Sequence, residues 1–91
     1  MSITYTAHAR DNLAYYGISE RDVKNVLDRA ERIFLDIKTG RLVAVGRWLK
    51  DKHLVVVFEK NDDTTVITVF PTSKIDKMIE GRIKRGRWLE I

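Results

Sequence analysis

The sequence predicts an α+β fold, in which two N-terminal helices pack on an approximately four-stranded antiparallel sheet and a basic helix follows. Three observations support this prediction. Apolar residues recur at helical spacing up to residue 30, and a period of two replaces it from Arg32 onward. Short polar turns then separate the strand-like runs, which is typical of antiparallel meanders. The length of 91 residues indicates one domain, residues 1–91, with a single core.

The N-terminal segment predicts a short strand followed by a helical hairpin. Ile3 to Thr6 alternates β-branched and aromatic residues, as a short strand does. The Thr6 hydroxyl can cap a helix of about residues 7–16, which Gly17 ends because glycine tolerates the left-handed conformation. Ser19 can cap a second helix in the same way. The apolar face of this second helix is formed by Val23, Val26, Leu27 and Ala30.

Four strand-like runs and a last helix follow. The run Leu54 to Phe58 is apolar without alternation, which predicts a central strand covered on both faces. Pro71 is expected to stop the last strand, and Thr72 or Ser73 to cap the helix. Because Gly81 costs about 1 kcal/mol inside a helix, we expect this helix to be short or broken there. The strand-like runs cover residues 33–37, 41–49, 53–60 and 64–70.

The composition excludes several classes of function. The chain has no cysteine, so disulfides, thiolate zinc sites and cysteine nucleophiles are excluded. No apolar run approaches the roughly 20 residues of a membrane span, and no signal-peptide core is present. A cytoplasmic protein that does not enter membranes is therefore expected. Gly-rich phosphate loops, metal-ligand spacings and nucleophile elbows are also missing, so no cofactor or metal is expected.

Basic residues are concentrated at the C-terminal end. The net charge of +4 is moderate, but from Lys74 onward six basic residues stand against three acidic ones. Such a segment beside Trp88 suits a phosphate-rich partner, although a solvated basic tail has the same composition. The basic residues are Lys74, Lys77, Arg82, Lys84, Arg85 and Arg87.

The chain has two histidines, which differ in their setting. His8 falls on the polar stripe of the first helix, with Asp11 one turn further on. A neutral imidazole there could act as a general base, and the alternative is a surface histidine bonded to backbone. His53 opens a strand directly after a charged turn, which favours placement at an edge rather than catalysis.

Two further features are candidates for binding an anion. Residues Pro71 to Lys74 offer backbone amides, two hydroxyls and a lysine at a helix start. Amide dipoles and a lysine attract negative charge together, although a plain helix cap is the alternative. Arg47 is the one charge within an otherwise apolar strand. It therefore either pairs with a carboxylate or lines a site.

Three segments occur here in a recognisable order, namely H-A-R-D-N-L-A-Y-Y-G-I-S, V-I-T-V-F-P-T-S-K and R-I-K-R-G-R-W. Together they resemble the RelE/ParE-type toxin-like superfamily. Within that superfamily the chain is most similar to a small uncharacterised RelE-like family, a domain of unknown function. The likeness covers nearly the whole chain, and it depends on the order and spacing of the segments.

The resemblance implies a metal-independent endoribonuclease, in which the 2′-OH of RNA attacks the adjacent phosphate. His8 would match the family's histidine as base or acid. Arg47 and Lys74 would stabilise the phosphate, and Thr72 would donate to a phosphate oxygen. An antitoxin protein could bind as well, and the run Leu54 to Phe58 leaves a homodimer open. Trp88 could stack on a base, and the alternative is that it covers the sheet. The RNA backbone would be held by Lys77, Arg82, Lys84, Arg85 and Arg87.

Two positions depart from the pattern of the superfamily. Relatives often carry an arginine one turn after the histidine and another just before Gly-Ile, where this chain has Asn12 and Tyr16. The loss of two cations beside His8 weakens its catalytic role. A non-catalytic module of the same fold, which binds nucleic acid or protein, therefore stays an alternative, because fold alone does not establish function.

Overall fold

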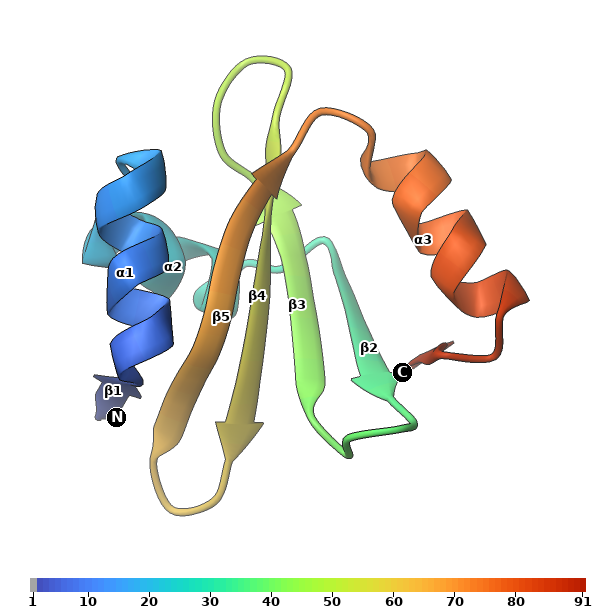
Figure 1. The fold of residues 1–91 in the computed structure, drawn as a ribbon, viewed down its shortest axis with the longest axis horizontal. Coiled ribbons are helices and arrows are strands. Elements are labelled where there is room, and N and C mark those ends of the chain that lie inside the picture. The colour runs from blue at the N-terminus through green and yellow to red at the C-terminus, as the bar shows by residue number, and fades with distance from the viewer. Residues whose placement is uncertain (1) are drawn as a thin grey trace.

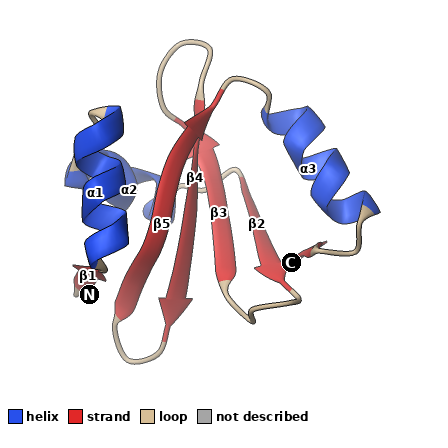
Figure 2. Cartoon of the chain, viewed as in Figure 1, coloured by secondary structure: helices blue, strands red, loops and turns tan. Residues whose placement is uncertain are grey.

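Within residues 2–91, which the computed structural model describes, a six-stranded mixed sheet carries helices on both faces (Figure 1). The strand order is β1-β5-β4-β3-β2-β6, and Figure 2 separates strands from helices by colour. In chain order the elements are β1 (Ile3–Tyr5), α1 (Ala7–Tyr16), α2 (Glu20–Asp28), β2 (Arg32–Asp36), β3 (Leu42–Arg47), β4 (His53–Lys60), β5 (Thr64–Thr72), α3 (Ile75–Lys84) and β6 (Trp88–Glu90).

The prediction of a four-stranded antiparallel sheet is wrong, although the α+β class agrees with the structure. Strands β2 to β5 form an antiparallel meander, but each edge of the sheet carries one more strand. β1 pairs in parallel with β5, and β6 pairs antiparallel with β2. Both added strands are only three residues long. The sequence predicts a strand at β1 but not its partner, and it does not predict β6, because both pairings depend on residues at the other end of the chain.

The first two helices begin at side-chain caps. Thr6 Oγ1 accepts a hydrogen bond from the Ala9 amide at 3.1 Å, and Gly17 ends α1 with a φ of 68°. Ser19 and Asp22 form a capping box at the start of α2, with both amide-to-side-chain distances at 3.0 Å. Both helices therefore start where the sequence predicts. No helix in the described part of the chain is long and apolar enough to cross a membrane.

The connection from β5 to α3 differs from the sequence prediction. Pro71 does not end the strand, because β5 continues to Thr72. A proline is tolerated there because β1 covers only the first part of β5, so Pro71 lies on an open edge. Lys74 occupies the N-cap position of α3 without a side-chain cap, so neither Thr72 nor Ser73 caps the helix. Nor is α3 broken at residue 81.

Each face of the sheet has its own core. β4 lies inside the sheet, and its residues alternate between the two cores, which explains its unbroken apolar run. Buried beneath α1 and α2 are Ala9, Leu13, Ile18, Val23, Val26, Ala44, Leu54, Val56, Phe58, Val66 and Val69. Buried on the α3 side are Phe34, Val43, Val45, Val55, Ile75, Ile79 and Trp88.

Candidate functional site

Side chains of three neighbouring strands form a row at the end of the sheet where β5 leads into α3. The register places Arg47 opposite His53, and His53 opposite Thr72. Residues directly opposite each other in adjacent strands project to the same face of a sheet. Two residues further along β3 and β4, Val45 and Val55 belong to the core on the α3 side. The row therefore lies on the α3 face.

Lys74 joins this row to the start of α3, because three open cavities meet at it. A cavity of about 520 Å³ is lined by Arg47, His53 and Lys74 among others. A second, of about 340 Å³, lies beside Lys52, Thr72 and Lys74. The third, of about 550 Å³, runs from Thr72 and Lys74 along α3. The structure thus brings together three of the predicted catalytic residues, Arg47, Thr72 and Lys74.

The carboxylate of Glu31 connects two residues of the row. Its Oε1 lies 3.1 Å from His53 Nε2, and its Oε2 lies 3.9 Å from Arg47 Nε. The Arg47 side chain is 67% exposed, whereas that of His53 is only 19% exposed. Arg47 is therefore held by one long ion pair and can still reach a ligand. Glu31 lies 22 residues before His53 in the sequence, so only the folded sheet reveals their contact.

His8 lies apart from this cluster. It is exposed on α1, on the other side of β5 from α3 (Figure 1). Within residues 2–91 its side chain has no hydrogen bond, ion pair or ring contact. It lines none of the three cavities that meet at Lys74. The fourth residue predicted as catalytic is thus not grouped with the other three.

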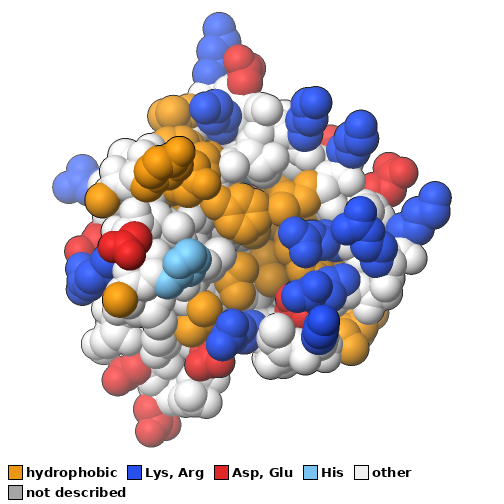
Figure 3. Space-filling view, in the orientation of Figure 1, with side chains coloured by type: hydrophobic (Ala, Val, Ile, Leu, Met, Phe, Trp, Pro, Cys, Tyr) orange, Lys and Arg blue, Asp and Glu red, His pale blue; other side chains and the backbone are white. Residues whose placement is uncertain are grey.

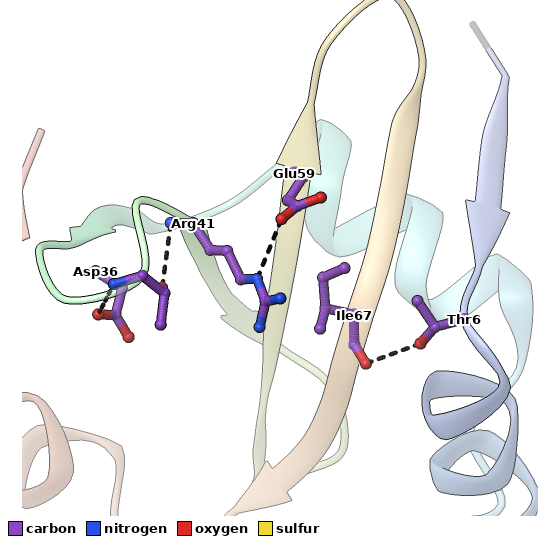
Figure 4. A network of polar contacts seen from close by, with 6 residues as sticks. Thr6, Asp36, Arg41, Glu59 and Ile67 are labelled. Atoms are coloured by element: carbon purple, nitrogen blue, oxygen red, sulfur yellow. Dashed lines mark hydrogen bonds and ion pairs between the residues drawn. The ribbon is translucent and has the colours of Figure 1, made fainter.

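Asn12, which stands where relatives often carry arginine, has a structural role. Its Oδ1 accepts hydrogen bonds from the Val69 amide at 3.2 Å and from the Thr68 hydroxyl at 3.5 Å. Thr6 Oγ1 donates to the Ile67 carbonyl at 3.1 Å (Figure 4). Because β1 pairs with only the first part of β5, the side chains of Thr6 and Asn12 bond backbone groups of β5 that β1 does not reach. Tyr16, the other departure, is exposed.

The cations predicted to bind RNA differ in exposure and in whether they are already paired. Figure 3 shows Lys and Arg side chains gathered over α3, beside a band of exposed hydrophobic side chains between α3 and α1. Arg82 is half-buried, with its guanidinium 5.4 Å from the centre of the Trp88 ring. Arg87 Nε donates to Asp36 Oδ1 at 3.0 Å, so its cation is already paired. The exposed cations of the set are Lys77, Lys84 and Arg85.

Trp88 and Asp36 belong to the structure of the α3 face rather than to its open surface. Trp88 is only 5% exposed, and its ring centre lies 5.1 Å from that of Phe34. Its burial leaves no ring face for the base stacking that the sequence suggested. Burial alone would raise the pKa of Asp36, but hydrogen bonds from Arg87 and from the Thr39 and Lys38 amides lower this pKa below its ordinary value.

The fold and the cluster together define a small α+β domain with two cations and a hydroxyl group beside open cavities at one end of its sheet. No group of three His, Cys, Asp or Glu side chains among the described residues is placed to hold a metal ion. The model of one family, described as a domain of unknown function (DUF4258), matches residues 5–71 of the chain.

Because this match covers more than half of the sequence, the protein belongs to the DUF4258 family. No curated protein and no solved structure was found to be similar to it. The match ends at Pro71, so it includes His8, Arg47 and His53 but not α3. The predicted membership of a small uncharacterised family agrees with this finding. A wider relationship to RelE/ParE toxins stays a prediction.

Proposed function

We propose that the protein binds RNA on its α3 face and cleaves it without a metal ion, in the manner of RelE-type nucleases. The observation that carries this proposal is the grouping of Arg47, Thr72 and Lys74 around connected open cavities. These residues come from β3, β5 and the start of α3, so the folded chain assembles the group.

The group can stabilise a phosphate whose negative charge increases during the reaction. Arg47 and Lys74 line the same cavity, and two cations there stabilise the charge of a pentacoordinate phosphorane. Thr72 Oγ1 accepts a hydrogen bond from the Lys74 amide at 3.1 Å. Its hydroxyl hydrogen is therefore free to donate to a phosphate oxygen.

The exposed cations of α3 extend this site along the molecule. Lys77 and Lys84 line the cavity of about 550 Å³ together with Lys74, and Arg85 lies at its end. Each cation that neutralises a phosphate releases counterions, which makes binding salt-dependent. An RNA strand whose backbone follows α3 would bring one of its phosphates to Thr72 and Lys74.

Cleavage is tested with purified protein and RNA in the presence of EDTA. We expect products that end in a 2′,3′-cyclic phosphate and a 5′-OH. Lys74→Ala should lower the cleavage rate about 100-fold, because a cation beside the phosphorane is removed. Lys60→Ala is the matched control, since Lys60 lies at the opposite end of the sheet. An absence of cleavage by the wild-type protein would contradict the nuclease proposal.

A second candidate function is RNA binding without cleavage. The placement of His8 favours it, because the predicted base does not line the Lys74 cavities. Binding is measured by fluorescence anisotropy at several salt concentrations. The double variant Lys84→Ala/Arg85→Ala should reduce the slope of log K against log [salt] by about 1.4, from two lost phosphate contacts on a single strand. Arg21→Ala, an exposed cation on α2, should leave this slope unchanged.

A further inference from the structure

His53 occupies the centre of the candidate site. It lies between Arg47 and Thr72 across the sheet. Its side chain lines the cavity of about 520 Å³ that also holds Arg47 and Lys74. It also lines a smaller cavity of about 260 Å³, where Glu31 approaches it. No other histidine lines the cavities that meet at Lys74 in the described chain.

The contact with Glu31 fixes which ring nitrogen of His53 carries the hydrogen. A carboxylate can only accept, so Nε2, 3.1 Å from Glu31 Oε1, is the protonated nitrogen. In the neutral ring the lone pair is then on Nδ1. Among residues 2–91, Nδ1 has no hydrogen-bond partner. Every buried side-chain nitrogen or oxygen among these residues does have a partner, so Nδ1 is not fully buried. Its lone pair can therefore accept a proton.

We propose that His53 is the general base of the cleavage reaction and that Glu31 is the residue that positions it. This inference rests on the proposed nuclease activity. His53 Nδ1 takes the proton of the 2′-OH while the 2′ oxygen forms a bond to phosphorus. The bond from phosphorus to the 5′ oxygen breaks, and this oxygen takes a proton from water in the open cavity. The resulting hydroxide accepts the proton of the imidazolium, which restores the neutral ring.

The charges around His53 suit this role. Glu31 orients the ring, while Arg47 and Lys74 place two cations in the cavity that His53 lines. The same cations are placed to bind the phosphate whose 2′-OH is deprotonated. The charged residues that line the two cavities beside His53 are Glu31, Arg32, Arg47, Lys50, Asp51, Lys74, Asp76 and Lys77.

The first test is cleavage by His53→Gln. We expect a loss of about 100-fold or more, the usual contribution of a general base, with RNA binding and the unfolding midpoint unchanged. Wild-type cleavage by this variant overturns the inference. A loss confined to His8→Gln also overturns it, because the base would then be His8. Asp62→Asn, in the turn at the far end of β4, is the control for handling and folding.

The second test compares kcat and KM for Glu31→Ala and Glu31→Gln, which keeps the inference falsifiable if His53→Gln does not fold. Alanine removes the acceptor of the Nε2 hydrogen bond, whereas the amide oxygen of glutamine still accepts it. Glu31→Ala should therefore lower kcat about 100-fold with KM unchanged, because the base is misplaced, and Glu31→Gln should restore most of kcat. A wild-type kcat for Glu31→Ala overturns the positioning role. If the wild-type protein binds RNA without cleaving it, the nuclease proposal fails together with this inference; wild-type cleavage that survives His53→Gln removes only this inference.

Discussion

The two faces of the sheet differ in how completely they are covered. α1 and α2 close one face over eleven buried residues, whereas the cluster on the α3 side has seven. Because α3 is a single helix, the strand ends beside it remain open, and three of the cavities meet at Lys74 there. The less covered face is thus the one with room for a ligand.

Polar side chains also have different roles on the two faces of the sheet. On the α1 side, Thr6 and Asn12 hydrogen-bond to the edge of β5, and Ser19 caps α2. The Thr6 hydroxyl and the Asn12 amide oxygen are therefore engaged in hydrogen bonds to the backbone of β5. On the α3 side, the Lys74 side chain has no hydrogen bond or ion pair within residues 2–91, and Arg47 has one long ion pair. This difference teaches that the loosely held cations, rather than the exposed histidine of α1, mark the candidate site.

The largest expected effect is on the free energy of unfolding. It tests whether the smaller core, on the α3 side, is essential for stability. Phe34 is fully buried on the α3 side and stacks near Trp88. Phe34→Ala should lower the free energy of unfolding by about 3–5 kcal/mol, measured by urea denaturation. Ile37→Ala, at an exposed position, should stay within about 0.5 kcal/mol of the wild type. A loss below about 1 kcal/mol for Phe34→Ala would show that the α3 face contributes little to stability.

The next effect concerns the Asp36–Arg87 pair on the same face. Asp36→Asn should cost about 2 kcal/mol at pH 7, because the acceptor of the Arg87 hydrogen bond loses its negative charge. The folded state lowers the pKa of Asp36, so its contribution is present above the ordinary value of 3.8 and disappears as pH falls below it. Unfolding of both proteins at several pH values checks this. A difference that persists well below pH 3.8 would contradict the assignment to Asp36.

A smaller effect tests how closely the α1–α2 face is packed. A Cβ atom at Gly46 would lie 3.2 Å from both Cγ atoms of Val26 on α2. Gly46→Val should therefore destabilise the protein by about 1.5 kcal/mol through overpacking, even though valine favours strands. Thermal unfolding gives the value, and the same substitution at Gly81, where a Cβ meets nothing within 4 Å, is the steric comparison. A stabilising Gly46→Val would show that α2 moves easily on the sheet.

The smallest effect compares two helix starts. Ser19→Ala should lower stability by about 1 kcal/mol, because it removes the hydroxyl that accepts from the Asp22 amide. Ser73→Ala should change stability by less than about 0.5 kcal/mol, since α3 has no side-chain cap. Equal effects in thermal unfolding would contradict this difference between the helices.

Local signals in the sequence predict much of the fold. The caps of α1 and α2 involve residues three positions apart, so Thr6 and Ser19 are recognisable without the structure. The meander of β2 to β5 is likewise joined by short polar turns. Pairings across the chain have no such signal. The parallel contact of β1 with β5 and the whole of β6 were therefore missed, as was the uncapped start of α3.

The candidate site was predictable only in part, for the same reason. Arg47 stands out as a charge in an apolar strand, and Thr72 and Lys74 as polar groups at a helix start. Their meeting, however, depends on the register of β3, β4 and β5. The contact between Glu31 and His53 depends on that register as well, so a histidine that looked like an edge residue proves to lie at the centre.

The position of β1 and β6 also has a consequence for the order of folding. Each outer strand pairs with residues far along the chain, as with Ile3 beside Thr64 and Phe34 beside Glu90. Closing such long loops costs entropy before any contact is gained, so these pairings form slowly and late. The outer strands should then be the first to open in hydrogen exchange, while the amides of β4 exchange last. The protein would fray from both edges of its sheet inward, and the ends of β3, β4 and β5 that carry the row would remain ordered.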